Sequence, residues 1–317
     1  MKDISDEVVR RKQTQLTTAL DPVLHLLNDA DVVEVMINPD TRVWVERIGE
    51  PPEQTDIKMT TAEIERAIRL VASIMQTTIS TDNPSVAGTL PQWNARIQAS
   101  MPPMVDSPAL CIRLPAKKVF NLNDYVAKGI LTVSQSQILH NAVMDRKNIL
   151  LGGGTGSGKT TLANALLDVI SVTGDRVIII EDNRELQCNA LNKVHFYTDA
   201  NVSLQRALFD SLRWRPDRII IGEVRDKAAL DLLKAWNTGH PGGVATIHAD
   251  STREMLTRMC QLIEENNMVA PKAFVAQTID LCVHIKRDKN LPAGRCLSGI
   301  SEVTGYKNGE WLISPVD

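Results

Sequence analysis

The chain has 317 residues, of which 43% are hydrophobic and 23% charged, with a formal net charge of -3 at pH 7. This composition excludes intrinsic disorder, and the length predicts two domains of ordinary size. Because 35 Lys and Arg are balanced by 38 Asp and Glu, direct DNA binding is not expected. No apolar run has the length of a transmembrane segment, and the N-terminus lacks the apolar core of a signal peptide, so we expect a cytoplasmic protein.

The N-terminal part predicts an α+β domain over residues 1–115. Residues 32–37 and 42–47 have the composition of strands and flank an Asn-Pro-Asp-Thr turn, which predicts a hairpin. Thr60 and Glu63 then form a capping-box pattern at the start of an amphipathic helix. This domain is the smaller of the two that we expect.

The sequence changes character after residue 115. We interpret residues 116–132 as a linker and residues 133–317 as a second domain, which opens with a capping-box pattern at Ser134 and Gln137. Strand and helix patterns then alternate, which is typical of a largely parallel sheet covered by helices. The expected strands are 148–151, 176–181, 193–197, 218–222 and 244–248, and the expected helices are 160–170, 203–213 and 227–238.

A phosphate-binding loop directly follows the first strand of this second domain. The residues are Gly153, Gly154, Thr155, Gly156, Ser157, Gly158, Lys159 and Thr160, which fit G-x-x-x-x-G-K-[ST] in full. Glycines let the backbone wrap a phosphate, and the following helix N-terminus favours an anion. We therefore predict a nucleoside triphosphate site in which Lys159 contacts the β- and γ-phosphates, Thr160 binds Mg²⁺ and Thr161 lies near phosphate.

Acidic residues follow two of the later strands. Glu181 ends the strand 176–181, and Glu223 follows the strand 218–222, so both belong to the edge of the sheet where α/β proteins bind ligands. ATP hydrolysis needs a carboxylate that orients the attacking water, and Mg²⁺ needs oxygen ligands. Glu181 and Glu223 are candidates for both roles, and the residues alone leave the assignment open.

The order of these motifs resembles that of a known family. A P-loop, an E-D-x-x-E box, a G-E-V-R-D box and a G-H-P-G-G-x-x-T-x-H-A box, in this order, look like the ATPases of type II and type IV secretion systems. The segments R-I-Q-A-S-M-P-P and C-I-R-L-P are most similar to those of the TrbB-like ATPases of conjugative transfer. A guanine-specific N-K-x-D motif is missing, and L-S-G-I matches an ABC signature only superficially.

The resemblance implies a RecA-like P-loop domain preceded by the smaller α+β domain, a homohexamer, and ATP and Mg²⁺ as ligands. It implies that the ring powers pilus biogenesis and transfer of DNA or protein at the cytoplasmic face of the inner membrane, with inner-membrane components of the machine as partners. Glu181 would be the base, Glu223 the Walker B residue that acts on the metal, and His240 and His248 would lie near the γ-phosphate. Arg96 and Arg113 match family arginines that reach nucleotide, and Arg213, Arg215 and Arg225 are further candidates.

Two other functions fit the same P-loop. One is a scaffold that senses nucleotide without hydrolysing it, and the other is a ring-shaped DNA motor with a RecA-like core. The balanced charge and the G-E-V-R-D and histidine boxes argue against the DNA motor.

Overall fold

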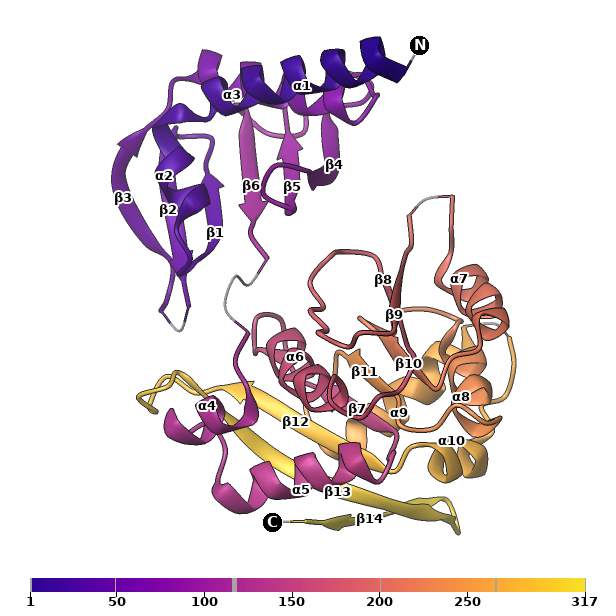
Figure 1. The fold of residues 1–317 in the computed structure, drawn as a ribbon. Helices are drawn as coiled ribbons and strands as arrows, with labels where there is room; N and C mark the ends of the chain where they lie inside the picture. The colour runs from indigo at the N-terminus through magenta and orange to yellow at the C-terminus, as the bar shows by residue number, and fades with distance from the viewer. Residues whose placement is uncertain (1, 49, 116–118, 200, 266, 317) are drawn as a thin grey trace. The chain divides into compact units, whose positions relative to one another are not determined.

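The computed structural model describes residues 2–48, 50–115, 119–199, 201–265 and 267–316 (Figure 1). The chain divides into two compact units, Met1–Lys118 and Val119–Asp317. Among the described residues, no helix combines the length and the apolar character needed to cross a membrane.

The N-terminal unit is built on a six-stranded antiparallel sheet with the order β3-β2-β1-β6-β5-β4. Its elements are α1 (Lys2–Ala19), η1 (Asp21–Val23), α2 (Leu24–Asn28), β1 (Val32–Ile37), β2 (Arg42–Arg47), β3 (Glu53–Lys58), α3 (Thr61–Ile74), β4 (Ser85–Leu90), β5 (Ala95–Ser100) and β6 (Ala109–Arg113). The predicted hairpin β1–β2 is confirmed, as is the capping box between Thr60 and Glu63 that begins α3.

The core of this unit lies between the sheet and the helices α1 and α3, which cross one side of it in Figure 1. Alternate strand residues such as Val35 and Ile97 are fully buried and belong to one apolar cluster with Leu20 and Ile68. Because side chains on a strand alternate between two faces, the residues between them form the second face of the sheet. On β5 this second face is polar, with Arg96, Gln98 and Ser100.

The C-terminal unit contains an eight-stranded sheet with the order β14-β13-β12-β7-β11-β10-β8-β9, in which β12 through β9 are parallel. Its strands are β7 (Ile149–Gly152), β8 (Val177–Glu181), β9 (Lys193–Tyr197), β10 (Arg218–Ile221), β11 (Val244–Ile247), β12 (Leu281–Arg287), β13 (Arg295–Lys307) and β14 (Glu310–Pro315). Its helices are α4 (Leu122–Ala127), α5 (Val133–Met144), α6 (Lys159–Ile170), α7 (Leu204–Ser211), η2 (Leu212–Trp214), α8 (Ala229–Asn237), α9 (Thr252–Glu264) and α10 (Lys272–Thr278).

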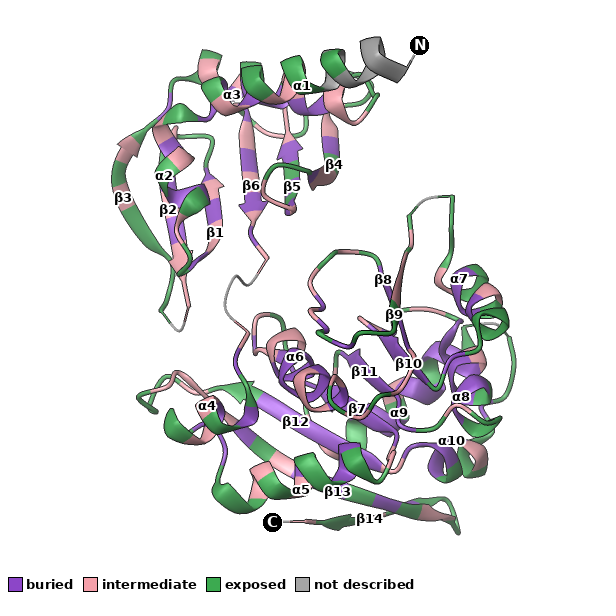
Figure 2. Ribbon diagram, viewed as in Figure 1, coloured by how far each residue is buried: buried purple, intermediate pink, exposed green. Residues whose placement is uncertain are grey.

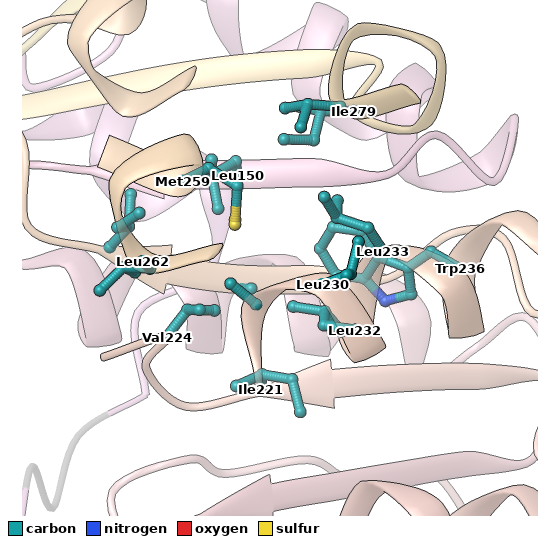
Figure 3. Close-up of a cluster of buried hydrophobic side chains, with 14 of the residues drawn as sticks. Leu150, Ile221, Val224, Leu230, Leu232, Leu233, Trp236, Met259, Leu262 and Ile279 are labelled. Carbon is teal, nitrogen blue, oxygen red and sulfur yellow. The ribbon is translucent and has the colours of Figure 1, made fainter. Parts of the chain in front are cut away.

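Helices cover both faces of this sheet, and the strand residues alternate between two apolar clusters. Ile178 and Ile180 of β8 pack with α7, α8, α9 and α10, whereas Val177 and Ile179 pack with α4, α5 and α6. Figure 2 shows that the central strands of this sheet, from β12 to β8, are buried along most of their length. Figure 3 shows part of the first cluster, including Trp236. The largely parallel sheet covered by helices that we predicted for this part of the chain is confirmed.

Two boundaries differ from those predicted. Residues 116–118 of the expected linker lie outside the described residues, but Phe120, Leu122 and Tyr125 are buried in the C-terminal core, because α4 packs on α5. The capping box of α5 is also two residues earlier than we predicted at Ser134. It joins Thr132 to Gln135, since the extended backbone of Thr132 lets its hydroxyl accept the N–H of Gln135 at 3.1 Å.

Candidate functional site

The P-loop lies between β7 and α6, at the carboxyl edge of the parallel strands. Three of its glycines, Gly153, Gly156 and Gly158, have positive φ angles of 155°, 66° and 105°, which L-residues rarely adopt. Gly154 and Thr155 are exposed at the tip of the loop, whereas the Ser157 side chain is buried. The Ser157 hydroxyl has no hydrogen-bond partner among the described residues, so it is available to an oxygen ligand within the loop.

Lys159 begins α6 and is buried, with 7% of its surface exposed. Its ammonium group donates to the carbonyls of Gly153 at 2.8 Å and Gly154 at 3.0 Å, so the positive charge lies over the loop. The next two residues, Thr160 and Thr161, are partly exposed in the first turn of α6. The loop glycines, the charge and the helix N-terminus therefore combine as an anion site requires.

His248 connects Lys159 to Glu223. The Lys159 ammonium lies 3.4 Å from His248 Nδ1, and His248 Nε2 lies 3.1 Å from Glu223 Oε1. Because an ammonium group only donates, Nδ1 must accept, which leaves the proton on Nε2, where it is donated to the carboxylate. Burial and the Lys159 charge lower the pKa of His248, which agrees with a neutral imidazole.

Arg225 holds the other oxygen of Glu223. Its guanidinium donates to Glu223 Oε2 at 2.6 Å and to Asp182 Oδ2 at 2.7 Å, which links the acidic box to the G-E-V-R-D box. Burial alone would raise the pKa of Glu223, but Arg225, His248 and Lys159 outweigh it, and the pKa is lowered. Glu223 is therefore a weak base that stays ionised, a property that suits an electrostatic role.

Glu181 stands beside these residues at the end of β8 and is 4% exposed. Its Oε2 accepts the backbone N–H groups of Glu185 at 3.0 Å and Leu186 at 2.8 Å, and its Oε1 lies 3.4 Å from His195 Nδ1. The carboxylate is thus fixed in orientation. Gly222 is needed next to it, because a Cβ there would lie 2.9 Å from Glu181 Cβ.

The two histidines of the box lie beyond opposite ends of β11, a strand inside the sheet. We predicted both near the γ-phosphate, but His240 precedes β11 and His248 follows it, and β11 runs parallel to β7. His240 Nδ1 donates to the Ala235 carbonyl at 3.1 Å, near the end of α8, while the P-loop lies at the far end of β7. Within one chain the structure therefore brings only His248 to the phosphate loop.

The predicted arginines belong to different surroundings. Arg96 and Arg113 face each other on the adjacent strands β5 and β6 of the N-terminal unit, Arg96 exposed and Arg113 half-buried. Arg213 lies over the Phe209 ring, 4.4 Å from its centroid, and pairs weakly with Asp210. Of the candidates in the C-terminal unit, Arg225 contacts the carboxylates of the site.

Three further residues, which no sequence motif indicates, support the site. Arg287 donates to the Gly156 carbonyl at 2.8 Å, and Arg295 lies 3.5 Å from the Ser157 carbonyl. Asn164 of α6 is buried and holds the acidic-box loop, donating to the Glu185 carbonyl at 3.1 Å and accepting the Gln187 N–H at 2.8 Å. No motif indicates them, although Asn164 lies four residues after Thr160 and so on the same face of α6.

The chain is similar to known proteins over most of its length. The family described as "Type II/IV secretion system protein" matches residues 16–305. The "Probable conjugal transfer protein TrbB" of Sinorhizobium fredii is 41% identical over 308 residues, which cover 96% of this chain and 93% of the relative. The "Type IV secretion system protein VirB11" of Bartonella henselae is 31% identical and covers 90% and 91% of the two chains.

A solved structure is similar in fold. The Legionella pneumophila ATPase DotB has a TM-score of 0.61 and 16% identity, over 93% of this chain and 79% of that chain. The expected combination of an N-terminal domain with a RecA-like C-terminal domain is confirmed. The chain belongs to the type II/IV secretion system protein family and resembles its TrbB and VirB11 members over most of its length.

Proposed function

We propose that the chain is a homohexameric ATPase that hydrolyses ATP to power pilus biogenesis and the transfer of DNA or protein by a conjugative type IV secretion system. The full-length similarity to conjugal transfer proteins supports the system. In this proposal the ring works at the cytoplasmic face of the inner membrane, against membrane components of the machine. The observation that carries the proposal is the chain of contacts from Lys159 through His248 to Glu223.

The P-loop residues bind the polyphosphate in this proposal. Lys159 exchanges its contacts with the Gly153 and Gly154 carbonyls for oxygens of the β- and γ-phosphates. His248 then loses the neighbour whose charge lowers its pKa, while Nε2 still donates to Glu223. A movement of Lys159 is thereby transmitted to Glu223 through the His248 imidazole, which contacts both residues.

The oxygen donors at this edge fit Mg²⁺. Mg²⁺ usually takes one or two protein oxygens, with phosphate and water as its other ligands, so a cluster of acidic side chains is not required. Thr160 is the proposed direct ligand, and Glu223 acts on the metal and its water ligands, since its lowered pKa keeps it charged. The bound ion would neutralise negative charge that develops on the phosphates.

Glu181 is the proposed base. Its two backbone hydrogen bonds to Oε2 leave Oε1, on the His195 side, as the oxygen that accepts a proton from water. Glu223 is the weaker candidate because both of its oxygens have close partners, Arg225 at 2.6 Å and His248 at 3.1 Å, whereas Glu181 Oε1 has only the longer contact of 3.4 Å with His195. This geometry supports the assignment that the family resemblance implies.

Arginines from the N-terminal unit complete the site across subunits in the proposed ring. Arg96 and Arg113 lie directly opposite each other on the polar face of their sheet, so a single anion could contact both. A guanidinium that binds the γ-phosphoryl oxygens would stabilise the charge of the transition state. Arg113→Ala should then lower ATPase activity without preventing assembly.

Complementation of a conjugation-deficient strain tests the motor against its rivals. Glu181→Gln should bind ATP yet abolish both hydrolysis and transfer, and Lys159→Ala should lose binding as well. Transfer by a Glu181→Gln protein that hydrolyses no ATP would favour a nucleotide-sensing scaffold. Hydrolysis that requires DNA, together with strand displacement, would favour a DNA motor.

A further inference from the structure

The end of β12 runs beside the P-loop. β12 is parallel to β7, and their last paired residues are His284 and Gly152, so β12 continues past the strand that leads into the loop. The contact there is close: a Cβ on Gly153 would lie 2.2 Å from the Ile285 carbonyl oxygen. The strands β12 and β13 therefore form one wall of the phosphate loop.

Two arginines project from this wall onto the loop. Arg287 Nε donates to the Gly156 carbonyl at 2.8 Å, and Arg295 Nη1 makes a longer approach of 3.5 Å to the Ser157 carbonyl. Hypothetical Cβ atoms on Gly156 and Gly158 would lie within 2.4 and 2.7 Å of these guanidinium groups. The glycines of the motif thus make room for arginines on the outside of the loop as well as for phosphate inside it.

These contacts orient the peptide groups of the loop. In a trans peptide, the carbonyl of one residue and the N–H of the next point in opposite directions. A guanidinium that holds the Gly156 carbonyl therefore turns the Ser157 N–H to the opposite side of that peptide, where it makes a long hydrogen bond of 3.3 Å to the Gly154 carbonyl. Arg295 acts in the same way on the next peptide, which joins Ser157 to Gly158. A phosphate oxygen would take the place of the Gly154 carbonyl, because backbone N–H groups are the donors through which such a loop binds phosphate.

The same two arginines are paired with each other across the antiparallel strands β12 and β13. Together with Lys159 they place three positive charges on the backbone of the same loop. The arrangement therefore favours a ligand with several negative charges, as a nucleoside di- or triphosphate has.

We propose that Arg287 and Arg295 are positioning residues that hold the P-loop amides in the orientation that binds the β- and γ-phosphates of nucleotide in the same subunit. The inference rests on the proposed function, since it concerns how that site binds its substrate. These residues act on ground-state binding through the loop backbone. They differ in this from Arg96 and Arg113, which are proposed to act on the transition state from a neighbouring subunit.

The test measures ADP binding by calorimetry and steady-state ATPase kinetics on the full-length protein. Arg287→Ala should weaken ADP binding and raise KM by about tenfold, as loss of one charge-assisted hydrogen bond predicts. Its kcat should stay within about twofold of the wild-type value, because binding before reaction is what the residue supports. Arg295→Ala should have a smaller effect in the same direction, since its contact is longer.

Two comparison variants separate positioning from general damage. Lys286→Ala removes an exposed cation of the same strand whose side chain points to the other face, and it should leave binding unchanged. Arg287→Lys keeps the charge but loses the planar fork, so it should restore part of the affinity.

The outcomes distinguish this inference from the proposed function. If the wild type binds ADP and Arg287→Ala binds it equally well, the inference alone is overturned. The same holds if Arg287→Ala loses kcat without a change in KM. A folded wild-type protein that binds no ADP would overturn the inference and the proposed function together.

Discussion

Replacing Gly243 with alanine should destabilise the C-terminal unit, because the added methyl group would overlap the Trp236 indole. A Cβ at this position would lie 2.0 Å from Trp236 Nε1 and 2.7 Å from the Ile219 carbonyl oxygen. Trp236 is 1% exposed, and its Nε1 donates to that same carbonyl at 3.0 Å. The indole has to move, and its hydrogen bond to Ile219 is lost with that movement.

The expected cost has two parts. Overpacking a core typically costs about 1–3 kcal/mol. A buried donor and acceptor left without partners add about 1–3 kcal/mol. We therefore expect the free energy of unfolding to fall by about 2–6 kcal/mol, or by about 1–3 kcal/mol if the indole finds another acceptor.

Urea denaturation followed by far-ultraviolet circular dichroism measures this change. Gly299→Ala is the matched control, because its Cβ would meet only Thr252 Cγ2, at 3.8 Å. Without a clash, that substitution in a strand should be neutral or stabilising by about 0.5–1 kcal/mol. Gly243→Ala and Gly299→Ala should therefore differ in sign or by several kcal/mol.

A double-mutant cycle makes the cause specific. Trp236→Phe removes the part of the indole that the new methyl group would meet, so the double variant should be less destabilised than the sum of the two single variants. Additive effects, or a Gly243→Ala protein as stable as the wild type, would refute the packing argument. Gly243 is the second of the two adjacent glycines in the histidine box, and the result would show that it is needed to leave room for Trp236.

Further changes test the electrostatics. Burial raises the pKa of Glu223 and Arg225 lowers it, so Arg225→Ala should move the acidic limb of the pH profile of kcat/KM to higher pH. A limb that does not move would show that the ionisation of Glu223 does not set it. Asp175→Asn should cost about 3–5 kcal/mol of unfolding free energy, since it leaves the buried Arg218 guanidinium without its carboxylate, whereas Asp210→Asn, in exposed pairs, should cost under about 1 kcal/mol. Burial raises the pKa of Asp175, but Arg218 outweighs it and the pKa is lowered. The stability that Asp175 contributes is therefore present at neutral pH and is lost as pH falls through the lowered pKa. The free energy of unfolding should then change less with pH in Asp175→Asn than in the wild type.

The centre of the site was predictable because its signals are local. The P-loop pattern places Lys159 at a helix start, and Glu181, Glu223 and His248 each follow an apolar strand. Parallel strands bring their carboxyl ends to one edge, so three separate motifs meet there. The position of His240 could have been predicted by the same rule, because it precedes the strand that His248 follows.

What the sequence did not predict depends on pairing over long distances. Arg287 reaches the P-loop because β12 pairs with β7, and nothing within residues 281–287 identifies that partner. The predicted linker contains Phe120, Leu122 and Tyr125, whose burial depends on α5 and α6. The capping box at Thr132 was missed because Ser134 and Gln137 offer the same pattern two residues later.

The central claim, hydrolysis of ATP at this P-loop with Glu181 as base, is tested most directly by phosphate release from purified protein under saturating ATP and Mg²⁺. We expect turnover by the wild type and none by Glu181→Gln, while Glu181→Gln still binds ATP with an affinity close to that of the wild type. Turnover by Glu181→Gln at the wild-type rate would contradict the account.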